Sequence, residues 1–143
     1  MTNKTKRPVS MYILLVLIIF QGISGLAGGI GLILDPSGKS LQIPLSWLDG
    51  SPFSNYLIPG LILFVVLGLY PLVVFYGLLK KIIWSWLAAF ILGPALIIWI
   101  GVEIIIIGYH AQPPLQLIYG LVGLIILFLV FLPSVRRFLK SEK

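Results

Sequence analysis

Residues 9–34 read VSMYILLVLIIFQGISGLAGGIGLIL, an uncharged stretch that lies between Arg7 and Asp35. A helix needs roughly 20 apolar residues to cross the hydrocarbon core of a bilayer, so this stretch is long enough to span a membrane. A cleaved signal peptide is the alternative, but the apolar part of a signal peptide runs only about 7–15 residues. We therefore expect a membrane helix over residues 9–34.

The composition of the whole chain also indicates a membrane protein. Hydrophobic residues make up 59% of it and charged residues 10%, and the mean hydropathy is +1.12. Such a chain has too little polar surface to cover a soluble globule. The net charge of +6 is divided among short basic clusters between uncharged runs, rather than forming the stripe that a nucleic acid would need. We expect a lipid bilayer as the surroundings and no nucleic-acid partner.

Three further apolar runs predict helices near residues 53–79, 83–108 and 114–133, with a tail at 134–143. Strands of a membrane barrel need only about 9–11 residues, so these runs are too long for strands. Every backbone polar group in lipid must be satisfied within the protein, which leaves helices. The sequence therefore predicts an all-α fold, a four-transmembrane-helix bundle forming one domain over residues 1–143.

The basic residues predict how this bundle is oriented, because Lys and Arg in short loops stay on the cytoplasmic side. The side of the membrane that carries the connection between the first two helices, residues 35–52, receives only Lys39, together with Asp35 and Asp49. The opposite side receives Lys4, Lys6, Arg7, Lys80, Lys81, Arg136, Arg137, Lys140 and Lys143. We expect both termini in the cytoplasm.

The connection at residues 35–52 is expected to form an interfacial outer segment between the first two helices. It opens with Asp35, Pro36, Ser37 and Gly38, the residue types of a type I turn. The following residues are too apolar for a solvated loop, and Pro44 can start a short helix that ends before Gly50. Trp47 would anchor this segment at the membrane surface.

Small residues in the first span predict close helix packing. Gly25 and Gly29 are four residues apart, as are Ser24 and Gly28, and at this spacing small residues let two helix backbones approach each other. This packing can lie within the chain or form a homo-oligomer. Pro71 and Pro94 fall inside the second and third spans, where each removes a backbone hydrogen bond and should bend its helix.

Glu103 is the one ionisable residue inside an apolar span, and an embedded carboxylate points to a functional site. We predict that it lines a polar recess on the outer side rather than facing lipid. Alternatively, it reaches the interface or bonds to a neighbouring helix. The candidate ligand-binding residues are Glu103, Trp99, His110, Tyr109 and Tyr119. The aromatic ones also suit a membrane-boundary belt, and Gln21 in the first span suits helix packing.

The sequence contains no pattern for a catalytic residue, a cofactor or a metal. There is no cysteine and only one histidine, so a nucleophile, base and orienting group cannot be assembled from a motif. The glycines of the first span follow no strand and precede no phosphate-binding lysine, which excludes a nucleotide loop. We expect neither a cofactor nor a metal site.

Several strings resemble a group of uncharacterised small bacterial membrane proteins: LDPSG at 34–38, SPFSNYLIPG at 51–60, WIGVEIIIIGY at 99–109 and PPLQLIYG at 113–120. More distantly, four spans with a long first outer loop are similar to the DoxX-like families. The resemblance implies a bacterial inner-membrane location and no particular activity.

Three functions remain open from the sequence. The first is non-enzymatic binding of a lipid-like or apolar small molecule, or of a membrane partner, in the outer half of the bundle. The second is a proton-coupled carrier or pore that uses Glu103 and His110, although a path needs polar groups at several depths. The third is an intramembrane enzyme that uses the same pair for proton transfer.

Overall fold

The computed structural model describes residues 6–110 and 114–141, and every regular element within these ranges is a helix. The α-helices are α1 (Val9–Leu34), α2 (Leu57–Phe64), α3 (Tyr70–Leu79), α4 (Ser85–Ile107), α5 (Leu115–Val130) and α6 (Pro133–Lys140). A π-helical stretch, η3 (Val65–Leu69), joins α2 to α3, and the 3-10 turns η1 (Lys39–Leu41) and η2 (Leu45–Leu48) lie between α1 and α2. The prediction of an all-α fold is confirmed.

Length and composition make three of these helical segments able to cross a membrane. They are Val9–Leu34, Leu57–Leu79 and Ser85–Ile107. A fourth arises if α5 and α6, which meet at a bend of 62°, are counted as one span.

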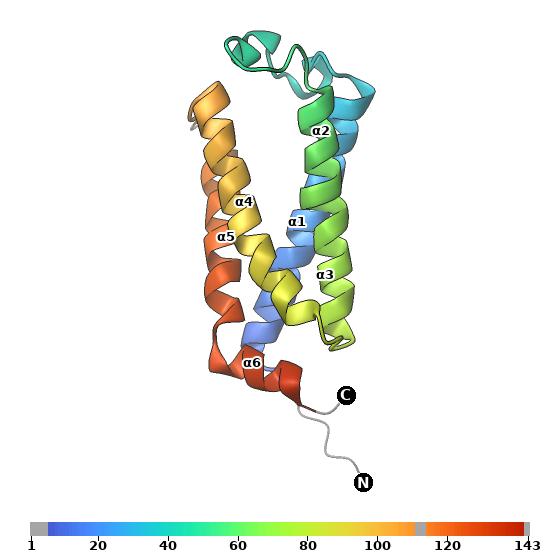
Figure 1. Ribbon diagram of the computed structural model, residues 1–143, viewed down its shortest axis with the longest axis vertical. Coiled ribbons are helices and arrows are strands. Elements are labelled where there is room, and N and C mark those ends of the chain that lie inside the picture. The colour runs from blue at the N-terminus through green and yellow to red at the C-terminus, as the bar shows by residue number, and fades with distance from the viewer. Residues whose placement is uncertain (1–5, 111–113, 142–143) are drawn as a thin grey trace.

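The helices form two pairs that meet at one end and diverge toward the other (Figure 1). α1 packs along α2 and α3, and α4 packs along α5. α3 also contacts α4, whereas among the described residues α2 makes little or no contact with α4. The start of α1 and α6 lie where the pairs meet, which we call the basic end (Figure 1). We call the opposite end, which carries residues 35–56, the loop end.

The half of the bundle near the basic end is filled by a close-packed apolar core. Met11, Leu14 and Ile18 of α1 are fully buried there. Val74, Leu78, Leu92, Ile126 and Val130 from α3, α4 and α5 complete this core. α6 covers this core at the basic end with Val135 and Phe138, which are also buried.

α1 approaches η3 through its small residues. A Cβ atom added to Gly25 would overlap the carbonyl of Leu67 and lie 2.7 Å from the nitrogen of Gly68. A Cβ atom on Gly29 would lie 2.6 Å from that of Phe64. Only glycine allows the two backbones to lie this close.

Pro71 accounts for the polar side chain of Gln21 in the contact between α1 and η3. Proline has no N–H, so the carbonyl of Leu67, four residues earlier, loses its usual α-helical donor. Gln21 on α1 donates to that carbonyl from Nε2 at 3.2 Å. The helix is locally π-helical immediately before Pro71, a common accommodation of a disturbed hydrogen-bond ladder.

Two boundaries differ from the sequence-based ones. The second span begins at Leu57 rather than near residue 53, because the Ser51 Oγ accepts from the Phe53 N–H in a local turn and Asn55 accepts from the Leu57 N–H. The segment treated as a tail from residue 134 contains α6, whose Val135 and Phe138 face the bundle. The predicted turns after α1 are present: Gly38 N–H donates to the Asp35 carbonyl at 3.1 Å, and η2 follows Pro44.

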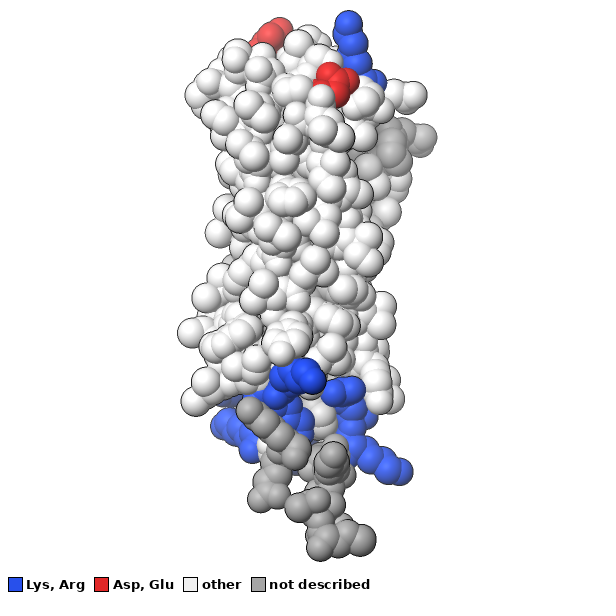
Figure 2. Space-filling view, turned by 90° about the vertical axis from the view of Figure 1, so that its right-hand side faces the viewer, with Lys and Arg blue, Asp and Glu red and all other residues white. Residues whose placement is uncertain are grey.

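Charged side chains gather at the two ends, and the face shown in Figure 2 is uncharged between them. At the basic end, Lys81 Nζ lies 3.9 Å from the centre of the Phe138 ring and donates to Ser141, which helps to fix α6. The guanidinium of Arg136 lies 4.9 Å from the Trp86 ring. Such contacts keep the cations beside aromatic faces while their outer surfaces remain solvated.

Candidate functional site

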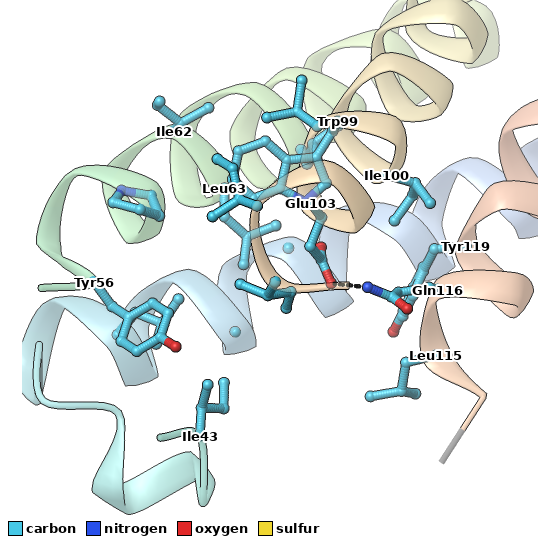
Figure 3. A pocket seen from close by; sticks show the side chains of 18 of the residues that line it. Ile43, Tyr56, Ile62, Leu63, Trp99, Ile100, Glu103, Leu115, Gln116 and Tyr119 are labelled. Carbon is cyan, nitrogen blue, oxygen red and sulfur yellow. Dashed lines mark hydrogen bonds between the residues drawn. The ribbon is translucent and has the colours of Figure 1, made fainter. Parts of the chain in front are cut away.

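A cavity of about 360 Å³ lies between the two helix pairs in the half near the loop end. This volume falls at the small end of the range of ligand-binding pockets. α1, α2, α4 and α5 all contribute to its wall, and Leu41, Ile43 and Leu48 of the connection at residues 35–56 cover it at the loop end. The wall is predominantly apolar because Leu and Ile make up half of its lining residues (Figure 3).

The main polar group on this wall is a pair formed by Glu103 of α4 and Gln116 of α5. Gln116 Nε2 donates to Glu103 Oε1 at 3.3 Å, the bond drawn in Figure 3. The same nitrogen donates to the carbonyl of Gly108 at 3.0 Å. Gln116 is only 4% exposed, so its amide is held in one orientation, and it keeps the Glu103 side chain directed into the cavity.

The chain turns back after α4, and this turn brings a hydrogen-bond donor to the oxygen of the Gln116 amide. Gly108 ends the helix with φ of +80°, a conformation that glycine adopts without strain. His110 N–H then donates to Gln116 Oε1 at 2.7 Å. The His110 ring nitrogen Nε2 bonds to the Ile107 carbonyl, also at 2.7 Å. The end of α4 and the start of α5 are thus tied together through the Gln116 amide.

The cover of the cavity is attached to both helix pairs. Trp47 in η2 stacks on the His110 ring with ring centres 4.1 Å apart. On the other side, the Tyr56 hydroxyl donates to the Pro44 carbonyl at 2.6 Å. Burial, and to a lesser degree the charge of Glu103, raise the pKa of Tyr56, so the phenol remains protonated as a donor.

Between α2 and α4 the cavity wall includes partly exposed side chains, and we call this stretch, at Ile62 and Val102, the lateral window. Ile62 of α2 and Val102 of α4 both line the cavity, yet they are 38% and 43% exposed. α2 and α4, which carry these residues, diverge toward the loop end (Figure 1). The window is bordered by apolar side chains, so an apolar molecule meets no polar barrier there.

The end of the cavity nearest the core carries Gln21 and Ser24 of α1. Gln21 is 2% exposed, and its Oε1 has no hydrogen-bond partner among the described residues. Gln21 contributes to the contact between α1 and η3 through its Nε2. At this end the cavity borders the apolar core.

The residues selected from the sequence divide into two groups. Glu103, Trp99 and Tyr119 line the cavity (Figure 3), together with Gly25 and Gly28 of the α1 glycine set. His110 does not line it and acts through Gln116, while Tyr109 is 53% exposed and Gly29 packs on Phe64. Gln116 and Tyr56 were not selected. The sequence does single out Gln116, which is a polar residue at the second position of the largely apolar run at residues 115–130.

The described part of the chain contains no group of three side chains that could hold a metal ion. No protein-family model, curated protein or solved structure matches the chain.

Proposed function

We propose that this protein binds a lipid-like or apolar small molecule in the cavity between its two helix pairs. The observation that carries the proposal is an apolar space of about 360 Å³ with one polar pair, Glu103 and Gln116, on its wall. Binding sites for small molecules typically combine an apolar lining with a few fixed polar groups. The Gln116 amide, held by Gly108 and His110, supplies that fixed geometry.

We further propose that the chain crosses a bacterial inner membrane four times, with the basic end in the cytoplasm. The cluster of Lys and Arg at that end supports this orientation (Figure 2). α5 would be the fourth span, and α6 would lie along the inner surface with its basic residues toward the lipid headgroups. The cavity would then lie within the outer leaflet.

In this orientation the ligand would reach the cavity sideways from the outer leaflet. The window beside Ile62 and Val102 faces the region where acyl chains lie. The packed core below the cavity, including Leu14, Ile18 and Leu92, favours binding over a proton-coupled carrier, because transport needs a polar path to the other side.

A photo-crosslinking experiment tests this function. The purified protein in phosphatidylcholine nanodiscs is labelled with decanol that carries a diazirine, and unlabelled decanol competes. We expect saturable labelling of wall residues such as Leu63, Ile100 and Ile106. Labelling confined to lipid-facing residues, unaffected by competitor, would show that the cavity does not bind.

A pair of variants on α4 isolates the window. Val102→Trp places a large ring at the opening and should reduce saturable labelling at least tenfold. Ile105→Trp adds the same ring to the same helix, at a position that is 83% exposed and outside the cavity wall, and should leave labelling unchanged. Equal labelling of the two variants would exclude the window as the route.

A further inference from the structure

We infer that the ligand carries an organic ammonium group on an apolar body, and that Glu103 binds this group. This inference rests on the proposed function and names its ligand class. Glu103 lies on the wall of an apolar cavity, where a carboxylate is costly unless a cation, a proton or water offsets its charge.

The hydrogen bonds of Glu103 leave it able to accept more. A carboxylate has about four acceptor positions. Within the described residues, Glu103 accepts a hydrogen bond at 3.3 Å from a Gln116 nitrogen that also serves the Gly108 carbonyl at 3.0 Å, and the Trp99 side chain is a further hydrogen-bond partner. The Gln116 oxygen is occupied by His110 N–H. Gln116 therefore positions the carboxylate without saturating it.

Among the described residues, Glu103 has no Lys or Arg partner, and the basic group that acts on it is the His110 imidazole. In residues 6–110 and 114–141, no Lys or Arg forms an ion pair with it, since the basic side chains lie at the far end or, for Lys39, on η1. The ring Nε2 of His110 is directed at the Ile107 carbonyl instead. A ligand cation would supply the missing charge.

Aromatic side chains near the carboxylate suit a cation as well. Trp99, one turn before Glu103 on α4, lies beside it, and Tyr119 and Tyr56 line the same cavity (Figure 3). Ring faces attract ammonium groups and do so more strongly when water is excluded. The Leu and Ile side chains of the wall and the lateral window would take the apolar part of the same molecule.

Charge then decides which ligands bind best. In surroundings of low dielectric constant, attraction between a carboxylate and an ammonium is much stronger than in water. A neutral alcohol can only donate one hydrogen bond to Glu103, and a carboxylic acid anion is repelled by it. We therefore expect the order ammonium, alcohol, carboxylate for ligands that share one chain.

Three competitors with the same decyl chain test this order: decylammonium, decanol and decanoate. Each competes with the diazirine decanol for labelling of the cavity wall, with concentrations expressed per nanodisc lipid. We expect decylammonium to compete at least tenfold better than decanol, and decanoate to compete least. In Glu103→Gln the advantage of the ammonium should disappear while decanol competes as before.

Asp49→Asn is the matched control, because it removes the same charge from an exposed position on the connection at residues 35–56. It should keep the wild-type order. Unfolding curves show whether Glu103→Gln is folded; if it is not, the competition order in the wild-type protein decides alone. Saturable labelling without an advantage for decylammonium would overturn this inference and leave the proposed function intact. Absence of saturable labelling would overturn both.

Nanodiscs that contain phosphatidylethanolamine distinguish two sources of the ammonium group. If this lipid reduces labelling relative to nanodiscs of phosphatidylglycerol, whose headgroup carries no ammonium, and Glu103→Gln removes the effect, a lipid headgroup supplies the cation. If it has no effect while decylammonium competes, the ligand is a free amphiphile. Both results support the ammonium class.

Discussion

Replacing Gly25 by alanine should destabilise the bundle, since this glycine lies at the closest contact between α1 and η3. The added Cβ would overlap the Leu67 carbonyl, and its 2.7 Å separation from the Gly68 nitrogen must open to about 3.4 Å for ordinary contact. α1 cannot move away without lengthening the 3.2 Å bond from Gln21 to that carbonyl, one turn along the helix.

The expected magnitude follows from these two losses. Overpacking a well-packed contact costs about 1–3 kcal/mol. An interhelical hydrogen bond in a membrane protein contributes about 0.6 kcal/mol on average and up to about 1.7. Alanine returns about 0.5–1 kcal/mol through its higher helix propensity. We therefore expect the free energy of unfolding to fall by about 1–3 kcal/mol.

Gly101→Ala is the control, because a Cβ atom there meets nothing within 4 Å. It should stabilise α4 by about 0.4–1 kcal/mol. Both variants can be compared with the parent by SDS-induced unfolding in mixed micelles, followed by circular dichroism. Equal stability of Gly25→Ala and Gly101→Ala would show that α1 does not pack on η3 as described.

Three other predictions test separate parts of the structure. Gln21→Leu should lower the free energy of unfolding by about 1 kcal/mol. In a Pro71→Ala background the loss should be smaller, because residue 71 regains an N–H for the Leu67 carbonyl. Equal losses in both backgrounds would contradict this pairing. Trp47→Ala should speed hydrogen exchange in the connection at residues 35–56 by removing a ring stack of about 0.5–1.5 kcal/mol, and unchanged exchange would argue against an attached cover. Lys39→Cys and Lys140→Cys, in a chain without cysteine, should react with an impermeant thiol reagent from opposite sides of intact membranes; labelling from one side would refute the proposed orientation.

The helical elements were predictable because their signal is local. An uncharged run such as residues 9–34 permits few conformations in lipid, and α1 occupies that range. α6 could also have been recognised, since Val135 and Phe138 are apolar at helical spacing among basic residues. The prediction of a tail was based on the charge of this segment and did not consider the helical spacing of its apolar residues.

The details of the site depend on contacts between distant residues, which a single sequence does not show. Gln21 donates to a carbonyl 46 positions away, so its pairing with the proline-disturbed ladder needed the packing of α1 on η3. Gln116 became central because Gly108 adopts a positive φ and returns His110 toward α5. The window beside Val102 depends on the angle between the helix pairs, which side-chain packing at the basic end determines.

The unequal lengths of α1 and α5 have a consequence for the surrounding lipid. At 1.5 Å per residue, the 26 residues of α1 extend about 39 Å and the 16 residues of α5 about 24 Å, against a hydrocarbon thickness of about 30 Å. α1 runs obliquely through the bundle, which shortens its reach, but α5 ends at the bend into α6 (Figure 1). In the proposed orientation this hydrophobic mismatch would thin the bilayer beside α5, so that face should prefer lipids with shorter acyl chains.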